Sequence, residues 1–351
     1  MSVRYIGSKA RVIEAIAPFI GSPPKRGGVF VDGFCGTGVV AEAAARRGWN
    51  VHLNDHLACA VTMAAARVTP RSQAQFRDFG GYASALDQLN AAPDREGFIW
   101  REYTPQSQRR CGVARMYFTE RNARRIDGVR KKIGDWRRAS RISATEERLL
   151  LADLLAATNK VANIAGTYGC FMSHWLPQSQ QALALQPRAL PAMRARVTVS
   201  EGDVADLEVG TDDLVYLDPP YTKRQYAAYY HVLETITVGD EPTVEGITGL
   251  RPWQAKASDF CYRSRALDAL ASLIDSLKAR RVLLSYSDEG HVPLKPLTQR
   301  LSSIGRLEAV PLMEIGRYRP NRAASSARDA VTEYLLVLER PELTVRQRAL
   351  A

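Results

Sequence analysis

Cysteine is scarce in this chain, and the cysteines that occur are not placed to cross-link it. Five are scattered among the 351 residues, with no Cys-x-x-Cys pair: Cys35, Cys59, Cys111, Cys170 and Cys261. This usage is typical of reduced core residues in a cytoplasmic protein and excludes a disulfide scaffold or a zinc-binding cysteine motif. The five histidines have no metal-ligand spacing either. We therefore expect a site that holds no metal ion.

Long apolar runs are missing as well. No segment approaches the roughly 20 apolar residues that span a membrane, and Met1-Ser2-Val3-Arg4 opens no signal-peptide apolar region. The sequence also contains no internal repeat or low-complexity tract. A hydrophobic content of 46% over 351 residues predicts a folded core, in one large domain with insertions or in two domains.

Negative charge is in deficit, most of all in one segment. The formal net charge is +11, and residues 101–141 carry thirteen Lys or Arg against four Asp or Glu. A localised positive block of this kind is typical of a protein that binds a phosphate backbone. The alternative is a solvated helix face in an arginine-rich protein.

Short apolar segments separated by helical patterns predict a doubly wound α/β sheet. Seven strands are expected, at residues 29–32, 51–55, 197–201, 214–218, 281–286, 307–313 and 331–338. The last two are close in sequence, which predicts an antiparallel hairpin at one edge of the sheet.

The second and third predicted strands are about 140 residues apart, far more than an ordinary crossover needs. Most of this gap has a helical pattern. Apolar residues recur there at three- and four-residue steps, with Thr119 as a candidate N-cap: Ile126, Val129, Ile133 and Trp136. We expect a helical insertion at residues 63–149 that contacts a partner with a phosphate backbone.

A second insertion is expected at residues 222–264. Its first part is basic and aromatic: Lys223, Arg224, Gln225, Tyr226, Tyr229, Tyr230 and His231. Such residues suit contacts to phosphates and unstacked bases, although a structural cover would explain them equally well. The predicted organisation is a catalytic domain at 1–62, 150–221 and 265–351, interrupted by the insertions at 63–149 and 222–264.

The most informative motif is Asp218-Pro219-Pro220-Tyr221, directly after an apolar strand. The prolines end the strand, because each fixes φ and lacks an N–H for the ladder. Asp218 and Tyr221 are therefore expected at the carboxyl edge of the sheet, where open α/β folds bind ligands. Acceptor oxygens beside an aromatic ring suit a planar amine, which predicts methylation of an exocyclic amino group on a nucleic-acid base.

A glycine loop, from Asp32 to Gly38, follows the first strand. Gly36 and Gly38 permit a tight turn and close approach to a ligand, and Asp55 ends the next strand at the usual place for a carboxylate that binds ribose hydroxyls. A dinucleotide site is disfavoured, because Ala41 stands at the position of the third glycine in Gly-x-Gly-x-x-Gly. A simple strand-to-helix turn is the structural alternative.

Tyr5-Ile6-Gly7-Ser8-Lys9 precedes an amphipathic helix. Its turn and Lys9 could hold a cofactor carboxylate by charge-assisted hydrogen bonds, although an ordinary N-terminal loop explains the segment equally well.

With these motifs, the chain resembles DNA adenine-N6 methyltransferases of the Dam-like class, and most closely the type II restriction-modification methylases. The cofactor loop precedes the catalytic motif, as in that class. Further matches cover almost the whole chain in the family's order: Asn54-Asp55, Tyr117-Phe118-Thr119 with Asn122-Ala123, Asn163 to Phe171, Arg224-Gln225-Tyr226, His231 to Thr235, and Ser285 to Gly290. One departure is Thr222, where these methylases often carry Asn.

The resemblance implies a Rossmann-like, seven-stranded S-adenosylmethionine-dependent methyltransferase sheet with a helical insertion. It implies S-adenosyl-L-methionine as the cofactor and double-stranded DNA as the partner, and it raises a separately encoded restriction endonuclease as a further partner. Asp218 and the Pro219 carbonyl would accept the two N–H bonds of the adenine amine, next to Pro220, and Tyr221 would stack on the base. A base in a duplex must be flipped out to reach them.

The resemblance also implies residues for the cofactor and for DNA. Expected at the cofactor are Tyr5, Gly7, Lys9, Asp32, Phe34, Gly36, Gly38, Asp55 and Asp203. Expected at DNA are Arg124, Arg125, Lys131, Lys132, Arg224, Tyr226, Tyr230, Arg317 and Arg319. A surface acid remains the alternative for Asp203, and a solvated loop charge for the last two arginines.

Two other classes of function stay open. One is an enzyme that methylates ribosomal RNA bases, since Asp-Pro-Pro-Tyr also occurs there. The other is a non-catalytic DNA-binding protein with a methyltransferase fold, which the intact Asp32, Asp55 and Asp218 disfavour. Cytosine-N4 enzymes usually carry Ser in place of Asp218. We expect the protein to lie in the bacterial cytoplasm, associated with the nucleoid.

Overall fold

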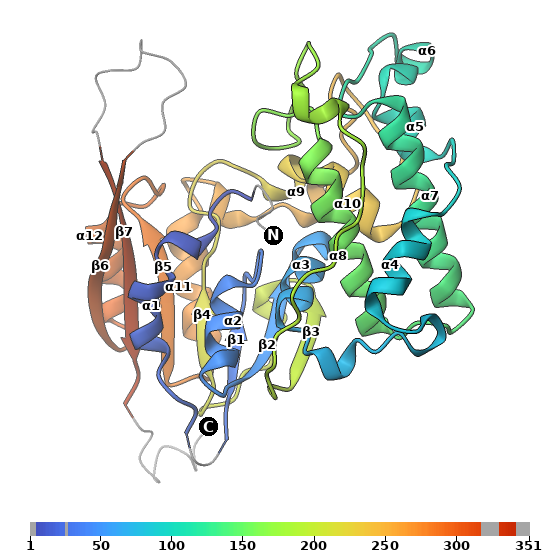
Figure 1. The fold of residues 1–351 in the computed structure, drawn as a ribbon. Coiled ribbons are helices and arrows are strands. Elements are labelled where there is room, and N and C mark those ends of the chain that lie inside the picture. The colour runs from blue at the N-terminus through green and yellow to red at the C-terminus, as the bar shows by residue number, and fades with distance from the viewer. Residues whose placement is uncertain (1–4, 25–26, 317–329, 342–351) are drawn as a thin grey trace.

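The computed structural model describes residues 5–24, 27–316 and 330–341. Seven strands in these residues form one sheet of order β3-β2-β1-β4-β5-β7-β6 (Figure 1). They are β1 (Val29–Asp32), β2 (Asn50–Asp55), β3 (Val197–Glu201), β4 (Leu214–Leu217), β5 (Arg281–Ser287), β6 (Arg306–Gly316) and β7 (Ala330–Glu339). The seven predicted strands are confirmed, and so is the mixed α/β class.

The first five strands of the chain run parallel, and β7 enters antiparallel between β5 and β6. The predicted hairpin of the last two strands is therefore confirmed. β6 is longer than predicted, because its ladder with β7 continues past an irregularity between Pro311 and Met313. A proline is tolerated there since β6 is the edge strand.

Helices cover both faces of the sheet. On one side α1 (Ile13–Ile20), α2 (Val39–Arg46) and α3 (Ala58–Val68) share a core with Phe30 and Tyr216. On the other side α11 (Ala266–Ser276) and α12 (Leu294–Ser302) form a second core with the opposite faces of the same strands. Parallel strands buried on both faces explain the continuous apolar runs seen in the sequence.

The long gap between β2 and β3 is largely helical. It contains α4 (Tyr82–Asn90), α5 (Phe98–Glu102), α6 (Gln108–Cys111), α7 (Glu120–Arg138) and α8 (Ala144–Val161). The predicted N-cap of α7 is confirmed, since the Thr119 hydroxyl accepts from the Asn122 N–H. The predicted apolar stripe of α7 is buried as well.

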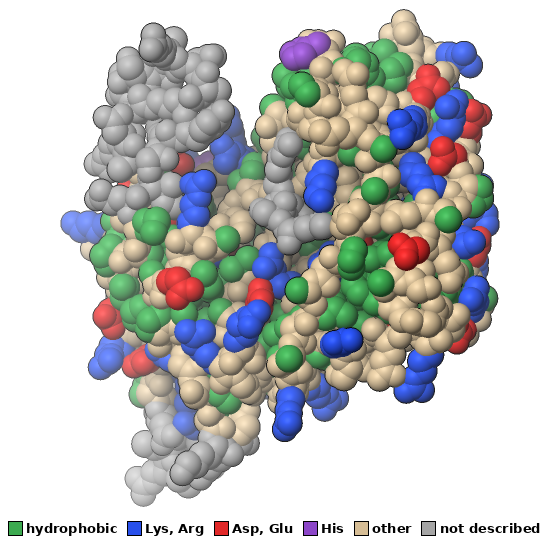
Figure 2. Space-filling view, viewed as in Figure 1, with side chains coloured by type: hydrophobic (Ala, Val, Ile, Leu, Met, Phe, Trp, Pro, Cys, Tyr) green, Lys and Arg blue, Asp and Glu red, His purple; other side chains and the backbone are tan. Residues whose placement is uncertain are grey.

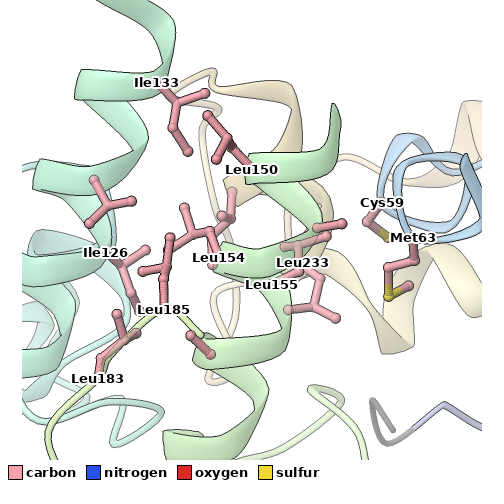
Figure 3. Packing of buried hydrophobic residues seen from close by; sticks show 14 of the residues in the cluster. Cys59, Met63, Ile126, Ile133, Leu150, Leu154, Leu155, Leu183, Leu185 and Leu233 are labelled. Carbon is pink, nitrogen blue, oxygen red and sulfur yellow. The ribbon is translucent and has the colours of Figure 1, made fainter. Parts of the chain in front are cut away.

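α8 connects this helical part to the sheet. Figure 3 shows Leu150 and Leu154 of α8 on the side of Ile126 and Ile133, while Leu155 lies toward Leu233 and the α3 residues. α10 (His231–Val238) and the short α9 (Tyr226–Tyr229) belong to the same core. The domain boundary expected between residues 149 and 150 falls inside α8. The division of the chain into domains stays a prediction.

Within the described ranges, no helix is both long enough and apolar enough to cross a membrane.

Candidate active site

Strand register brings the chemical groups together at the carboxyl edge of the sheet. Asp32 at the end of β1 pairs with Tyr216 of β4, and Asp218 follows two residues later on the same face. β7 runs the opposite way, so its beginning lies at this edge, where Glu333 pairs with Ser287 at the end of β5. Residues far apart in the sequence therefore meet where open α/β sheets bind ligands.

Lys9 lies between two carboxylates in this edge site. Its Nζ is 3.1 Å from Asp218 Oδ1 and 3.1 Å from Glu333 Oε2. The Tyr221 hydroxyl donates to Glu333 Oε1 at 3.1 Å, and Lys9 Nζ is 5.5 Å from the centre of the Tyr221 ring. The expected partner of Lys9 was a cofactor carboxylate, whereas in the structure both of these carboxylates belong to the protein.

Burial and neighbouring charges set the protonation of this cluster. Burial raises the pKa of Asp218 to about 6, although the Lys9 ammonium opposes the rise and the Glu333 charge adds to it. Burial by itself lowers the pKa of Lys9, but Asp218 and Glu333 outweigh it and raise that pKa. Lys9 thus stays cationic, and Asp218 is ionised at neutral pH.

Sequence reasoning missed Glu333. It lies in the predicted last strand, where the alternation of residues along the strand could have indicated it. Val331, Glu333, Leu335 and Val337 share one face of that strand, and all four are buried. An acid at an apolar position of a period-two pattern needs a buried partner, which here is Lys9.

A cavity of about 550 Å³ lies beside this cluster. Eight of the nine residues expected at the cofactor line it: Tyr5, Gly7, Lys9, Asp32, Phe34, Gly36, Asp55 and Asp203. Its size is in the usual range for a cofactor site. Asp32 is 1% exposed, and its Oδ1 has no hydrogen-bond partner within the part of the chain that the structure describes.

Gly38 is the ninth, and it is absent from the residues that line the cavity. Its φ is +73°, and an added Cβ would lie 2.7 Å from the Ala64 Cα. Gly38 therefore permits α2 to begin against α3, which is a packing role.

Asp55 braces the glycine loop. Its Oδ2 accepts from the Gly36 N–H at 3.1 Å, and its Oδ1 accepts from the Leu57 N–H at 3.1 Å. Burial raises the pKa of Asp55 to about 6, and these two hydrogen bonds oppose the rise. The side chain thus lines the cavity and fixes its shape at the same time.

Part of the second insertion forms a wall of the same cavity, which the sequence did not predict. Lys256 and Phe260 line it, and the Phe260 ring is 5.6 Å from the Phe34 ring. Lys256 bonds Glu234 and Glu201, each at 2.8 Å. Glu234 in turn accepts the first N–H groups of α3, from Ala58 and Cys59. The motif His231 to Thr235 thereby ties the insertion to the sheet domain.

A second cavity, of about 480 Å³, adjoins the first. The residues that the two share include Lys9, Pro220 and Tyr226, and those that line only the second include Tyr221, Thr222, Arg224, Ser287, Glu289 and Glu333. Asp218 lines the first cavity, beside the glycine loop, and its partner Lys9 also lines the second cavity, beside the Tyr221 ring.

Tyr230 has a different place from the one expected. It is fully buried, its ring stacks on Tyr5 at 4.4 Å, and its hydroxyl accepts from the Ile6 N–H at 2.7 Å. A buried side chain cannot contact DNA in this conformation, so the expectation is corrected: Tyr230 holds the N-terminal motif. Tyr226 and Arg224 do line the second cavity.

The basic residues of α7 are largely occupied within the protein. Arg124 pairs with Glu96 and Glu120, Lys131 pairs with Asp135, and Arg125 donates to backbone carbonyls of Leu89 and Ala92. In Figure 2, Lys and Arg side chains are spread over the face shown and do not form one block. The DNA contacts of α7 remain a prediction. Arg317 and Arg319 lie outside the described residues.

The sheet order and the cavity at its carboxyl edge define a Rossmann-like methyltransferase fold. The D12 class N6 adenine-specific DNA methyltransferase family matches residues 5–295, and the chain belongs to this family. Membership implies a methyl donor as co-substrate.

Named relatives resemble the chain over most of its length. It is 31% identical to the type II methyltransferase M.FokI of Planomicrobium okeanokoites, over 96% of the chain and 53% of that protein. It is 29% identical to modification methylase StsI of Streptococcus sanguinis (96% and 52%) and to the type II methyltransferase M.NlaIII of Neisseria lactamica (96% and 99%). The chain thus spans about half of the first two and nearly all of the third.

Proposed function

We propose that the chain transfers a methyl group from S-adenosyl-L-methionine to the N6 amine of an adenine flipped out of duplex DNA. The observation that carries the proposal is that Asp218 lines the cavity suited to the cofactor and contacts Lys9, which also lines the adjoining cavity suited to a base. Type II modification methylases among the relatives support a role in a restriction-modification system. A separately encoded endonuclease would be the partner enzyme, and the cytoplasmic nucleoid would be the location.

The first cavity fits the cofactor. The unpartnered Asp32 Oδ1 offers an acceptor, and Phe34 and Phe260 offer aromatic faces for an adenine ring. Asp203 and Asp55 are the acids placed to meet ribose hydroxyls or adenine donors. When bound, S-adenosyl-L-methionine supplies an electrophilic methyl group on a sulfonium.

Asp218, which lines the first cavity, and residues of the second cavity would together bind and activate the base. Asp218 and the Pro219 carbonyl accept the two N–H bonds of the amine, which draws the nitrogen toward sp³ geometry and frees its lone pair. Tyr221 stacks on the base, with its hydroxyl held by Glu333. Arg224 and Tyr226 line the second cavity, where a flipped nucleotide would need cationic and aromatic contacts.

Further DNA contacts are proposed for Arg124, Arg125, Lys131 and Lys132 and, outside the described residues, for Arg317 and Arg319. They would bind phosphates and carry the salt dependence of DNA binding.

The test is methyl transfer to defined substrates. Purified protein with tritiated S-adenosyl-L-methionine should label adenine in duplex DNA, and Asp218→Ala should lose transfer by about 10³-fold or more while cofactor binding survives. Asp212→Ala, an exposed acid at the other end of β4, is the matched control and should keep full activity. Label in ribosomal RNA or in cytosine, or substantial turnover by Asp218→Ala, would contradict the proposal.

A further inference from the structure

We propose that Glu333 is a positioning residue for methyl transfer. It accepts a hydrogen bond from Lys9, so that Lys9 contacts two carboxylates, and it holds the Tyr221 hydroxyl. This inference rests on the proposed function and adds to it a residue from the far end of the chain. Glu333 lies on β7, more than 110 residues after the Asp-Pro-Pro-Tyr motif.

Glu333 is built into a rigid place. It is 8% exposed, on a strand paired on both sides, with β5 and with β6. Its two carboxylate oxygens have different partners, since Oε2 accepts from Lys9 and Oε1 accepts from the Tyr221 hydroxyl, both at 3.1 Å. One side chain therefore sets the position of the Lys9 cation and of the ring that would stack on the base.

The balance of charges explains why a second carboxylate is needed. The Asp218 side chain is only 16% exposed, and this partial burial disfavours its charge, so Lys9 nearby helps to keep it ionised. A one-to-one pair of Lys9 and Asp218 would be electrically neutral and would present little net field to the substrate. With Glu333 the cluster carries one net negative charge.

That negative charge lies where the reaction needs it. The adenine nitrogen becomes positive as its lone pair forms the bond to the methyl carbon, while the carbon–sulfur electron pair stays on sulfur as a neutral thioether. The methylated nitrogen then releases one proton to solvent. A preorganised negative cluster beside this nitrogen stabilises the transition state more than the ground state, where the amine is neutral.

The geometry also keeps an acceptor available. Lys9 contacts Asp218 through Oδ1 and Glu333 through Oε2, each at 3.1 Å, so Asp218 Oδ2 can accept from the amine. The Tyr221 ring lies at 59° to the Tyr286 ring, 5.7 Å away, and its hydroxyl bond to Glu333 fixes its rotation. Loss of Glu333 would let Lys9 bind Asp218 alone and free the ring.

The experiment removes the charge with little change of shape. Glu333→Gln should lower the single-turnover rate of methyl transfer to saturating DNA by about tenfold or more, with cofactor affinity unchanged within about twofold. Glu339→Gln, an acid farther along β7 with 44% side-chain exposure, is the control and should behave as wild type. Tyr221→Phe, which removes only the hydroxyl, should lose a smaller part of the rate.

A second readout is independent of turnover. Glu333 contributes to the raised pKa of Asp218, so Glu333→Gln should lower that pKa from about 6. Carboxyl titration of Asp218 by carbon NMR measures this directly, and the acid limb of the rate profile should move to lower pH by the same amount.

These outcomes separate the two proposals. If the wild-type protein methylates nothing, the proposed function fails, and the titration still decides whether Glu333 acts on Asp218. If the wild-type protein is active but Glu333→Gln keeps its rate, or leaves the Asp218 titration in place, Glu333 is merely structural and this inference is overturned.

Discussion

Asp55 illustrates how one side chain can serve a ligand and the loop that binds it. Its carboxylate braces the Gly36 and Leu57 N–H groups and lines the cofactor cavity. A carboxylate that accepts two backbone N–H bonds is held in one rotamer, so its removal would loosen the loop as well as delete a contact.

Asp55→Ala should therefore weaken cofactor binding by about tenfold or more, and DNA binding much less. Calorimetry with each ligand separately measures both affinities. Asp206→Ala, an exposed acid that follows the residues lining the cavity, is the control and should leave both unchanged. An equal loss for the two ligands would indicate general unfolding instead of a cofactor role.

At the scale of elements, the second insertion is tied to α3 by Glu234. Its carboxylate caps the positive end of that helix and pairs with Lys256 in the cavity wall. A buried acid at a helix N-terminus stabilises by both hydrogen bonding and the helix dipole. The insertion thus depends on the same element that packs against the glycine loop.

Glu234→Gln should lower the free energy of unfolding by about 1–2 kcal/mol and also weaken cofactor binding, because Lys256 loses its buried partner. Thermal unfolding with and without cofactor measures both effects. Glu14→Gln is the matched control, since Glu14 is an exposed first-turn acid of α1 with no capping hydrogen bond. If the Glu234 variant is as stable as the control, the capping argument is wrong.

For the molecule as a whole, α7 is the element at which we predict that DNA binds. The charge pattern favours α7, but most of its arginines pair within the protein. An arginine that pairs within the protein can still exchange its carboxylate partner for a DNA phosphate, because an exposed ion pair contributes only about 0–1 kcal/mol to stability.

The α7 residues are tested together by replacing Arg124, Arg125, Lys131 and Lys132 with Gln. The slope of log affinity against log salt should fall by up to about 0.9 for each phosphate that the variant no longer neutralises. Fluorescence anisotropy of labelled duplex DNA over a salt series measures this slope.

A control set takes four exposed basic residues elsewhere, Arg71, Arg77, Lys278 and Lys295. An unchanged slope in the α7 variant, or an equal change in the control, would place the DNA footprint elsewhere.

The strands, the motif at the end of β4 and the glycine loop could be predicted from the sequence, because these depend on local periodicity and on proline and glycine geometry. The contacts of Lys9 with Asp218 and Glu333, the burial of Tyr230 and the place of Lys256 at the first cavity could be known only from the folded chain. Those contacts join residues far apart in the chain, and they follow from strand order and direction, which spacing along the sequence does not encode.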